Sequence, residues 1–348
     1  MNPAIDAGIL TGGRQCRRRL HIRDTLLETL YHVLIRHANP LGTLHGGVML
    51  EWMIDAATMT AMRVARRPTV LASMENIFFL SPVHVGENVV ITSWVDYIGR
   101  SSLEVSVYVE AENPLVSEER RMTTFSHMVL VAVDKRLRPT PIDACIEPSG
   151  HMEERLYEEA EKRRAERLSR ISDRKARIKD VQAPRPLDDR FYAVSLRYAY
   201  PEDAIFYNAL YAGKLVYYLD ELAGIIGTRY SGGPVVTASV DATDFYSPIM
   251  VGESIEMHAA LTYVGRSSME VTLKVLARRE ETGETRHTTT SYFTVVAVDE
   301  TGHSRLVPQF KPREEWQARL YREAEKRRKR RLELLRSIRQ MEIPRMKP

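Results

Sequence analysis

Apolar residues cover nearly every side of a helix in two stretches of the chain. From Gly47 the sequence reads GVMLEWMIDAAT (47–58), in which almost every position is apolar. A helix without a polar face has no side for water, so we expect it to be buried. The stretch YAGKLVYYLDELAG (211–224) resembles it in the second half of the chain.

The segments around the first helix predict strands. One run precedes it, ETLYHVLIRH (28–37), and RFYAVSLRYA (190–199) holds the same place before the second helix. Four runs rich in Val, Ile, Thr and Tyr follow the first helix, separated by turns that contain glycine: TVLASMENIFFL (69–80), NVVITSWVDYIG (88–99), SSLEVSVYVEAE (101–112) and RMTTFSHMVLVAVD (121–134). One buried helix with about four antiparallel strands indicates an α+β unit whose sheet wraps around the helix.

The chain is an internal duplication. YIGRSSLEVSVYVEAE (97–112) matches YVGRSSMEVTLKVLAR (263–278), and ASMENIFFLSPVHVGENV (72–89) matches ASVDATDFYSPIMVGESI (238–255), both at an offset of 166. Even the charged run RLYEEAEKRR (155–164) recurs, as RLYREAEKRR (319–328). We therefore expect two units that pair edge to edge, which would cover exposed strand edges.

The duplication sets the expected boundaries of the parts. They are a leader at 1–24, a first unit at 25–149, a helical linker at 150–183, a second unit at 184–311 and a basic C-terminal helix at 312–348. The leader lacks the apolar core of a signal peptide, and we expect it to be solvated, although its RQCRRRLHIR (14–23) leaves a transit sequence open.

Composition and charge narrow the class of protein. The 348 residues carry a net charge of +4 and contain no apolar run long enough to span a membrane. The basic clusters (158–179 and 322–340) are interleaved with acidic residues, which predicts solvated, salt-bridged helices. Nucleic-acid binding is disfavoured because no aromatic stacking motif accompanies the charge. Cys16 and Cys145 are too few for a disulfide framework or a cysteine metal site, and we expect a reducing cytoplasm.

An ordered set of motifs resembles a known family. The chain contains N-x-x-G-x-x-H-G-G (39–47), FFLSPVHVGENV (78–89) and GRSSLEV (99–105) in this order. The set resembles the hotdog-fold acyl-CoA thioesterases, and the tandem arrangement resembles the cytosolic long-chain acyl-CoA hydrolases. The resemblance implies tandem hotdog domains, hydrolysis of fatty acyl-CoA to fatty acid and CoA, no metal or cofactor, and homotrimers.

The two glycines that open the first helix are the candidate oxyanion donors. The amides of Gly46 and Gly47 lie at the positive end of the helix dipole, where a thioester carbonyl could approach closely. Such donors each stabilise a developing oxyanion by roughly 3 kcal/mol. A plain tight turn into a packed helix is the alternative.

The family's helix carries an acid seven residues after the second glycine. In the second unit this position is Asp220, whereas in the first it is Ile54 and Asp55 lies one residue further on. Asp220 is expected to act as a general base, or as a nucleophile, and Asp55 to be held by a core hydrogen bond.

The family's loop asparagine shows the opposite loss. Asn39 precedes Gly47 by the required eight residues, but the second unit has Ile205 there, or Tyr200 if RHANP is aligned with RYAYP. Asn208 is a looser alternative with the wrong spacing. The two losses are complementary, so we expect one composite site made of Asn39, Gly46, Gly47 and Asp220, and an inactive reciprocal cleft.

The recurring GRSS turns are candidates for binding the CoA phosphates. Arginine suits phosphate and serine can donate hydrogen bonds, although an exposed turn with a structural glycine explains them nearly as well. His45 is expected to support the site rather than act as its base. The candidates for substrate binding are Arg100, Ser101, Ser102, Arg266, Ser267, Ser268 and His45.

Two other functions remain open. A non-catalytic acyl-CoA or lipid-binding hotdog protein would need no catalytic pair, and the retained Asn39 and Asp220 speak against it. A hotdog dehydratase acting on acyl thioesters would use a histidine, for which His45 is the candidate.

Overall fold

The computed structural model describes residues 16–116, 119–172 and 174–340. Each unit begins with a strand and a 3₁₀ turn, continues with one long helix and ends with a run of strands. The first unit comprises β2 (Leu27–His32), η2 (Ile35–His37), α1 (Gly46–Ala65), β3 (Thr69–Met74), β4 (Ile77–Phe78), β5 (Asn88–Ile98), β6 (Ser102–Glu112) and β7 (Arg120–Ala132). The second comprises η3 (Asp189–Phe191), β9 (Tyr192–Tyr198), η4 (Pro201–Asp203), α4 (Ala212–Ser231), β10 (Val235–Val240), β11 (Thr243–Asp244), β12 (Ser254–Val264), β13 (Ser268–Arg279) and β14 (Glu284–Ala297).

Two six-stranded sheets join the units. Their strand orders are β11-β3-β7-β6-β5-β2 and β4-β10-β14-β13-β12-β9, so each sheet takes its last, two-residue strand from the other unit. Ser239 and Val240 pair with Phe78 and Ile77, and the reciprocal pairing joins β11 to β3. The expected edge-to-edge pairing is therefore present, and it leaves β2 and β9 as the outer edges.

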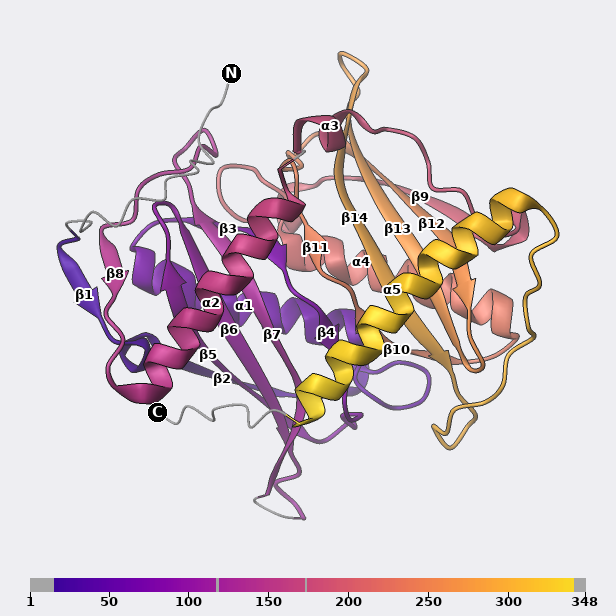
Figure 1. The fold of residues 1–348 in the computed structure, drawn as a ribbon, viewed down its shortest axis with the longest axis horizontal. Coiled ribbons are helices and arrows are strands. Elements are labelled where there is room, and N and C mark those ends of the chain that lie inside the picture. Colours follow the sequence, from indigo (N-terminus) through magenta and orange to yellow (C-terminus); the bar gives the residue numbers. More distant parts are fainter. Residues whose placement is uncertain (1–15, 117–118, 173, 341–348) are drawn as a thin grey trace.

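The two central helices are buried side by side. Most of the α1 side chains are buried, among them Leu50, Met53 and Ile54, because apolar residues occupy almost every position of the helix. α1 and α4 lie together on one side of the sheets, while α2 (Gly150–Arg170) and α5 (Glu315–Gln340) cross the opposite side, as Figure 1 shows. None of the described helices is both long enough and apolar enough to cross a membrane.

The charged helices pair mainly with the sheets beneath them. Arg163 and Arg167 of α2 bind Glu104 of β6 at 2.6 and 2.9 Å, and Glu104 is almost completely buried. Arg327 and Arg331 of α5 bind the equivalent Glu270 at 2.7 and 2.8 Å. The prediction of solvated helices with internal salt bridges missed these partners, because helical spacing within one segment says nothing of charges on a distant strand.

The N-terminal segment departs from the expectation of a solvated leader. Residues 16–25 form β1 (Arg18–Leu20), which pairs in parallel with β8 (Ala144–Ile146), and η1 (Ile22–Thr25), in which Ile22 is fully buried. Residues 1–15, including the start of the basic run considered as a transit sequence, lie outside the described chain.

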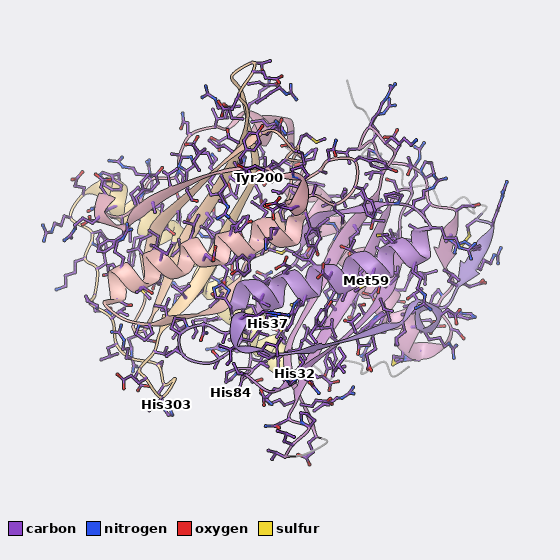
Figure 2. All side chains as sticks on the ribbon, turned by 180° about the vertical axis from the view of Figure 1, so that it is seen from behind. His32, His37, Met59, His84, Tyr200 and His303 are labelled. Atoms are coloured by element: carbon purple, nitrogen blue, oxygen red, sulfur yellow. A yellow bond between two sulfur atoms is a disulfide. The ribbon has the colours of Figure 1, made fainter. Side chains whose placement is uncertain are left out.

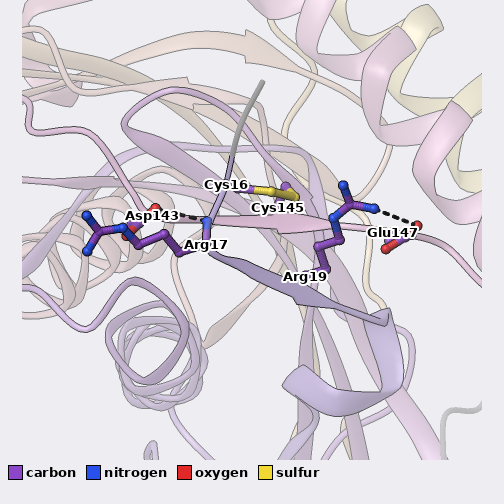
Figure 3. The surroundings of a disulfide bond; sticks show 6 residues. All are labelled: Cys16, Arg17, Arg19, Asp143, Cys145 and Glu147. Atoms are coloured by element: carbon purple, nitrogen blue, oxygen red, sulfur yellow. Dashed lines mark hydrogen bonds and ion pairs between the residues drawn. A yellow bond between two sulfur atoms is a disulfide. The ribbon is translucent and has the colours of Figure 1, made fainter. Parts of the chain in front are cut away.

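The two cysteines form a disulfide, which the sequence analysis did not expect. Cys16 and Cys145 form a disulfide across 129 residues of sequence, next to the ion pairs of Arg17 with Asp143 and of Arg19 with Glu147 (Figure 3). Counting cysteines could not reveal this pair, because the proximity of the two residues depends on the pairing of β1 with β8. The disulfide ties the start of the described chain to the end of the first unit.

Candidate active site

The N-terminus of α1 is built by a histidine and two glycines. His45 is the N-cap residue, and its Nδ1 accepts a hydrogen bond from the Gly47 N–H at 3.1 Å. The first N–H groups of a helix lack partners within the helix and carry its partial positive charge. Among the residues that the structure describes, no hydrogen bond engages the Gly46 N–H. The Gly46 N–H therefore remains available as a donor at this end of the helix.

Asp220 from the middle of α4 lies against this helix end. Its Oδ2 accepts from the Gly47 N–H at 2.6 Å and lies 3.4 Å from Nδ1 of His45, while its Oδ1 accepts from the Thr237 hydroxyl at 2.5 Å. Only 3% of Asp220 is exposed. Burial raises the pKa of its carboxyl, and the contacts with His45, Thr237 and Gly47 each lower it. A buried carboxylate with a raised pKa next to the free N–H of Gly46 has the features of a catalytic base.

The close approach of Asp220 depends on Gly46. A Cβ added at Gly46 would lie 2.9 Å from Oδ2 of Asp220 and 3.1 Å from Cβ of Thr237. At Gly47 an added Cβ would meet the backbone of Tyr217 at 3.0 Å. The two glycines therefore let the end of α1 approach both the side chain of Asp220 and the backbone of α4.

The side chain of Asn39 organises the loop before α1. Its Oδ1 accepts from the N–H groups of Leu41 and Thr43, and its Nδ2 donates to the Thr43 hydroxyl at 2.8 Å. These bonds are those of an asparagine that stabilises a turn. The structure thus brings together Asp220, His45, Gly46 and Gly47, whereas the amide of Asn39 is engaged within its own loop.

The register of the two loops resolves the alignment that the sequence left open. In the first unit the Asn39 N–H bonds to the Thr43 carbonyl, and in the second the Ile205 N–H bonds to the Ala209 carbonyl. Bridges between Ala38 and Leu44, and between Ala204 and Leu210, keep the same offset of 166. Ile205 is therefore the counterpart of Asn39, and the alternative alignment through Tyr200 is wrong. Asn208 is the counterpart of Gly42, and both adopt positive φ.

The reciprocal cleft has lost the polar groups of the composite one. Ile54 replaces Asp220, Leu71 replaces Thr237, and Tyr211 replaces His45 at the N-cap of α4. The Tyr211 hydroxyl donates to Asp55, as expected for a carboxylate satisfied by a core hydrogen bond. Burial raises the pKa of both groups, which keeps the tyrosine protonated. Figure 2 shows the two loops, marked by His37 and Tyr200, on opposite sides of the helix pair.

Comparison with known proteins agrees with this arrangement. The model of the thioesterase superfamily matches residues 41–118 and 207–284, two segments separated by the same offset of 166. Protein VdlD of Helicobacter pylori is 41% identical over 36% of this chain and 72% of its own length. The chain belongs to the thioesterase superfamily. This confirms the resemblance and the tandem α+β fold inferred from the sequence.

Several curated relatives that span most of the chain are named as acyl-CoA thioester hydrolases. The mouse cytosolic acyl coenzyme A thioester hydrolase is 28% identical over 80% of this chain and 76% of its own length. An acyl-ACP thioesterase from Bacteroides thetaiotaomicron superposes with a TM-score of 0.50 at 11% identity, covering 79% of this chain and all of that one, and shares the fold.

The GRSS turns of this thioesterase-family chain join neighbouring strands. The carbonyls of Arg100 and Arg266 accept from the N–H groups of Ile142 and Val307, while both arginine side chains are exposed. Serine carbonyls at Ser101 and Ser267 accept from Ala132 and Ala297. The backbone of each turn therefore has a structural role, as the alternative interpretation held.

The two turns lie beside different clefts. Ser268 pairs with Val296 on β14, one residue from Val295, which pairs with Thr237. The turn with Arg266, Ser267 and Ser268 thus lies two strands, roughly 10 Å, from Thr237 of the composite site. Ser102 has the equivalent relation to Leu71 of the reciprocal cleft. Only the second turn is placed by register near Asp220.

No direct signal in the sequence distinguishes Thr237. The residue precedes the matched segment ASVDATDFYSPIMVGESI by one position, and threonine is common in strands. Comparing the two units offers the one available signal, since Thr237 and Asp220 are replaced together by Leu71 and Ile54.

One buried cluster has ligand atoms spaced as in a metal site. Asp96, Glu104 and His127 of the first unit offer oxygen and nitrogen atoms within 4.8 Å of one another. Asp96 accepts from Trp94 at 2.8 Å and from Ser106, and both oxygens of Glu104 bind arginines of α2. These partners already supply the positive charge that a cation would bring, so the cluster fits an ion-pair network under α2.

Proposed function

We propose that the protein hydrolyses acyl-CoA thioesters at the composite cleft, giving a fatty acid and CoA. The observation that carries this proposal is the contact of Asp220, from the second unit, with the N-terminus of α1 in the first. A base, the free N–H of Gly46 and a glycine-lined approach for a carbonyl lie within a few ångströms of one another. Each is a requirement of thioester hydrolysis.

The chemistry divides between the two units. The thioester carbonyl oxygen binds at the Gly46 N–H, where the helix dipole stabilises the oxyanion that forms when water attacks. Asp220 takes a proton from that water, and the tetrahedral intermediate then collapses with cleavage of the C–S bond. The thiolate of CoA leaves and takes the proton that Asp220 accepted from the water, which restores the carboxylate. Direct attack of Asp220 on the carbonyl, through an anhydride, is the alternative route for the same carboxylate.

Asn39 completes the proposed catalytic set of Asn39, Gly46, Gly47 and Asp220. Its Nδ2 has two hydrogens, of which one is donated to Thr43, so the other can orient the water or the carbonyl. Its Oδ1, by holding the N–H groups of Leu41 and Thr43, fixes the loop beside His45. We infer that Asn39 both shapes the loop and contacts the substrate.

Thiol release from palmitoyl-CoA, followed with a thiol reagent, tests this proposal. Asp220→Ala and Asn39→Ala should each abolish hydrolysis. Asp55→Ala is the matched control, because Asp55 is one position from the equivalent of Asp220 in the reciprocal cleft, and it should retain most of the activity. Full activity of Asp220→Ala would refute the composite site. Tight CoA binding without thiol release would favour a non-catalytic acyl-CoA-binding protein.

We further propose that the protein acts on fatty acyl-CoA in the cytoplasm as a homotrimer. The mouse relative is named as cytosolic, which supports the compartment for this chain, although a disulfide such as that of Cys16 with Cys145 is rare in a reducing cytoplasm. The outer edge strands expose apolar side chains at Leu30 of β2 and at Val194 and Leu196 of β9, which suits burial between copies. Light scattering should give three times the mass of the chain, and a monomer would refute the trimer.

A further inference from the structure

The two clefts carry different charges at their entrances. In both units a 3₁₀ turn leads to the cap of the central helix and is fixed to it by one backbone hydrogen bond. The His45 N–H bonds to the His37 carbonyl at 2.9 Å, and the Tyr211 N–H bonds to the Asp203 carbonyl at 2.8 Å. Positions 36–37 and 202–203 therefore occupy equivalent places at the two entrances, with Arg36 and His37 at one and Glu202 and Asp203 at the other.

The reciprocal entrance is an open, acidic cavity of about 290 Å³. Its lining includes Glu51, Asp55, Glu202, Asp203, Ile205 and Lys214. Four of these side chains are carboxylic acids and one is a lysine. Burial raises the pKa of Glu51, and the charge of Asp203 raises it further, while Lys214 lowers it. The carboxyl groups thus interact with one another across the cavity.

At the composite cleft the positions equivalent to this lining carry different residues, among them Val48 in place of Lys214. Arg36 and His37 replace Glu202 and Asp203, Asn39 replaces Ile205, and Tyr217 replaces Glu51. Arg36 is exposed, and its Nε donates to Nε2 of His37 at 3.1 Å. His37 packs edge-on against Trp52 of α1, which fixes the turn to the helix. Of the four positions that are acidic at the reciprocal cleft, only one is acidic at the composite cleft, where Glu221 is the counterpart of Asp55.

We propose that Arg36, held by its hydrogen bond to His37, selects the polyanionic CoA portion of the substrate for the composite cleft, and that Glu202 and Asp203 exclude it from the reciprocal one. The proposal rests on the acyl-CoA hydrolysis proposed above. An acyl chain is uncharged and gains nothing from an arginine, whereas the phosphates of CoA are attracted by a cation and repelled by carboxylates at a cleft mouth. One CoA per chain follows from this asymmetry.

Two substrates that share an acyl group separate this effect from a structural one. The second substrate carries the same acyl group on N-acetylcysteamine, which lacks phosphate. Arg36→Glu should lower kcat/KM for acyl-CoA about tenfold more than kcat/KM for this second substrate, and the loss should lie in KM. Added salt should narrow the difference, because it screens exposed charges. Glu202→Arg makes the opposite change at the reciprocal entrance and is the matched control. In this variant the ratio of kcat/KM for the two substrates should stay within twofold of the wild-type ratio.

The outcomes distinguish this proposal from the proposed function. An unchanged substrate ratio in Arg36→Glu, or an equal loss on both thioesters, would overturn the role of Arg36. Calorimetric titration with CoA should show one site per chain in the wild type, weakened about tenfold by Arg36→Glu, and two equal sites would overturn the exclusion by Glu202 and Asp203. If the wild type binds CoA in this way but hydrolyses neither thioester, the proposed hydrolysis fails while the selection by charge stands.

Discussion

Gly46 is the position at which the composite cleft leaves least room for a side chain. In a Gly46→Ala variant the new Cβ would lie 2.9 and 3.2 Å from the two oxygens of Asp220 and 3.1 Å from Cβ of Thr237. Restoring an ordinary contact of 3.4 Å requires a shift of about half an ångström at the nearer oxygen. The carboxylate cannot turn aside without loss, because Gly47 and Thr237 hold its two oxygens.

This displacement gives the expected effect on catalysis. A misplacement of 1 Å in an active site can cost about a hundredfold in rate, so half that distance predicts a loss in kcat of about tenfold. The helix itself should not weaken, because alanine is favoured over glycine by up to about 1 kcal/mol in a helix. We expect a thermal midpoint within a few degrees of the wild type and a much lower rate of thiol release.

The second unit provides the matched control for Gly46→Ala. Ala212 is the residue equivalent to Gly46 and begins α4, so an alanine is accepted at this place in the fold. Ala212→Gly should lower stability by up to about 1 kcal/mol and leave kcat unchanged. Gly46→Ala with wild-type kcat, or the same loss of kcat in both variants, would refute the reasoning that the place of Asp220 against α1 sets the rate.

Three further changes test the surroundings of Asp220 and the N-terminal tie. Asp220→Asn should be inactive yet more stable than the wild type at neutral pH. The raised pKa of Asp220 stabilises the folded state only while the carboxyl is protonated, and this stability is lost as pH rises from the ordinary 3.8 through the raised value. Asparagine does not ionise, so the variant does not lose stability in this way. Equal thermal midpoints at pH 7 would contradict this. Thr237→Val removes a hydrogen bond that lowers the pKa of Asp220, so the pH–rate profile should move to higher pH, and an unmoved profile would exclude that role. Addition of a reductant, or the Cys16→Ser substitution, should lower the thermal midpoint, because a disulfide that closes a loop of 129 residues stabilises the fold by up to about 5 kcal/mol. Two titratable thiols in the wild-type protein would show that the disulfide does not form.

The fold was accessible from the sequence because its signals are local and occur twice. The helix from Gly47 is apolar on nearly every side and the strands after it are rich in β-branched residues, so the pattern alone predicts one buried helix against a sheet. The constant offset of 166 then fixes two units without any knowledge of contacts. The exchange of β4 and β11 between the sheets was less accessible, because strands of two residues carry no periodicity.

The partners of charged and sulfur-containing side chains were not accessible in the same way. Arg163 and Arg327 bind glutamates about 60 positions earlier in the chain, and Cys16 meets Cys145 only because two three-residue strands pair. Such contacts depend on tertiary structure, which cannot be inferred from the spacing of residues within one segment. Thr237 belongs to the same class, since only its place beside Asp220 distinguishes it from any threonine of a strand.

The asymmetry of the two clefts follows from the geometry of the helix pair. Each cleft takes its helix N-terminus from one unit and the residue facing that end from the other, so a single substitution alters one cleft and leaves the other unchanged. Ile54 removes the base from the reciprocal cleft and leaves Asp220 untouched, while Ile205 removes the loop amide from the same reciprocal cleft and leaves Asn39 in place. Losses scattered over both units therefore fall together in one cleft, and the other keeps every polar group. Restoring a single residue, such as Ile54→Asp, would consequently not reactivate the reciprocal cleft, because Leu71, Ile205 and Tyr211 would still lack the hydrogen bonds that the composite cleft provides.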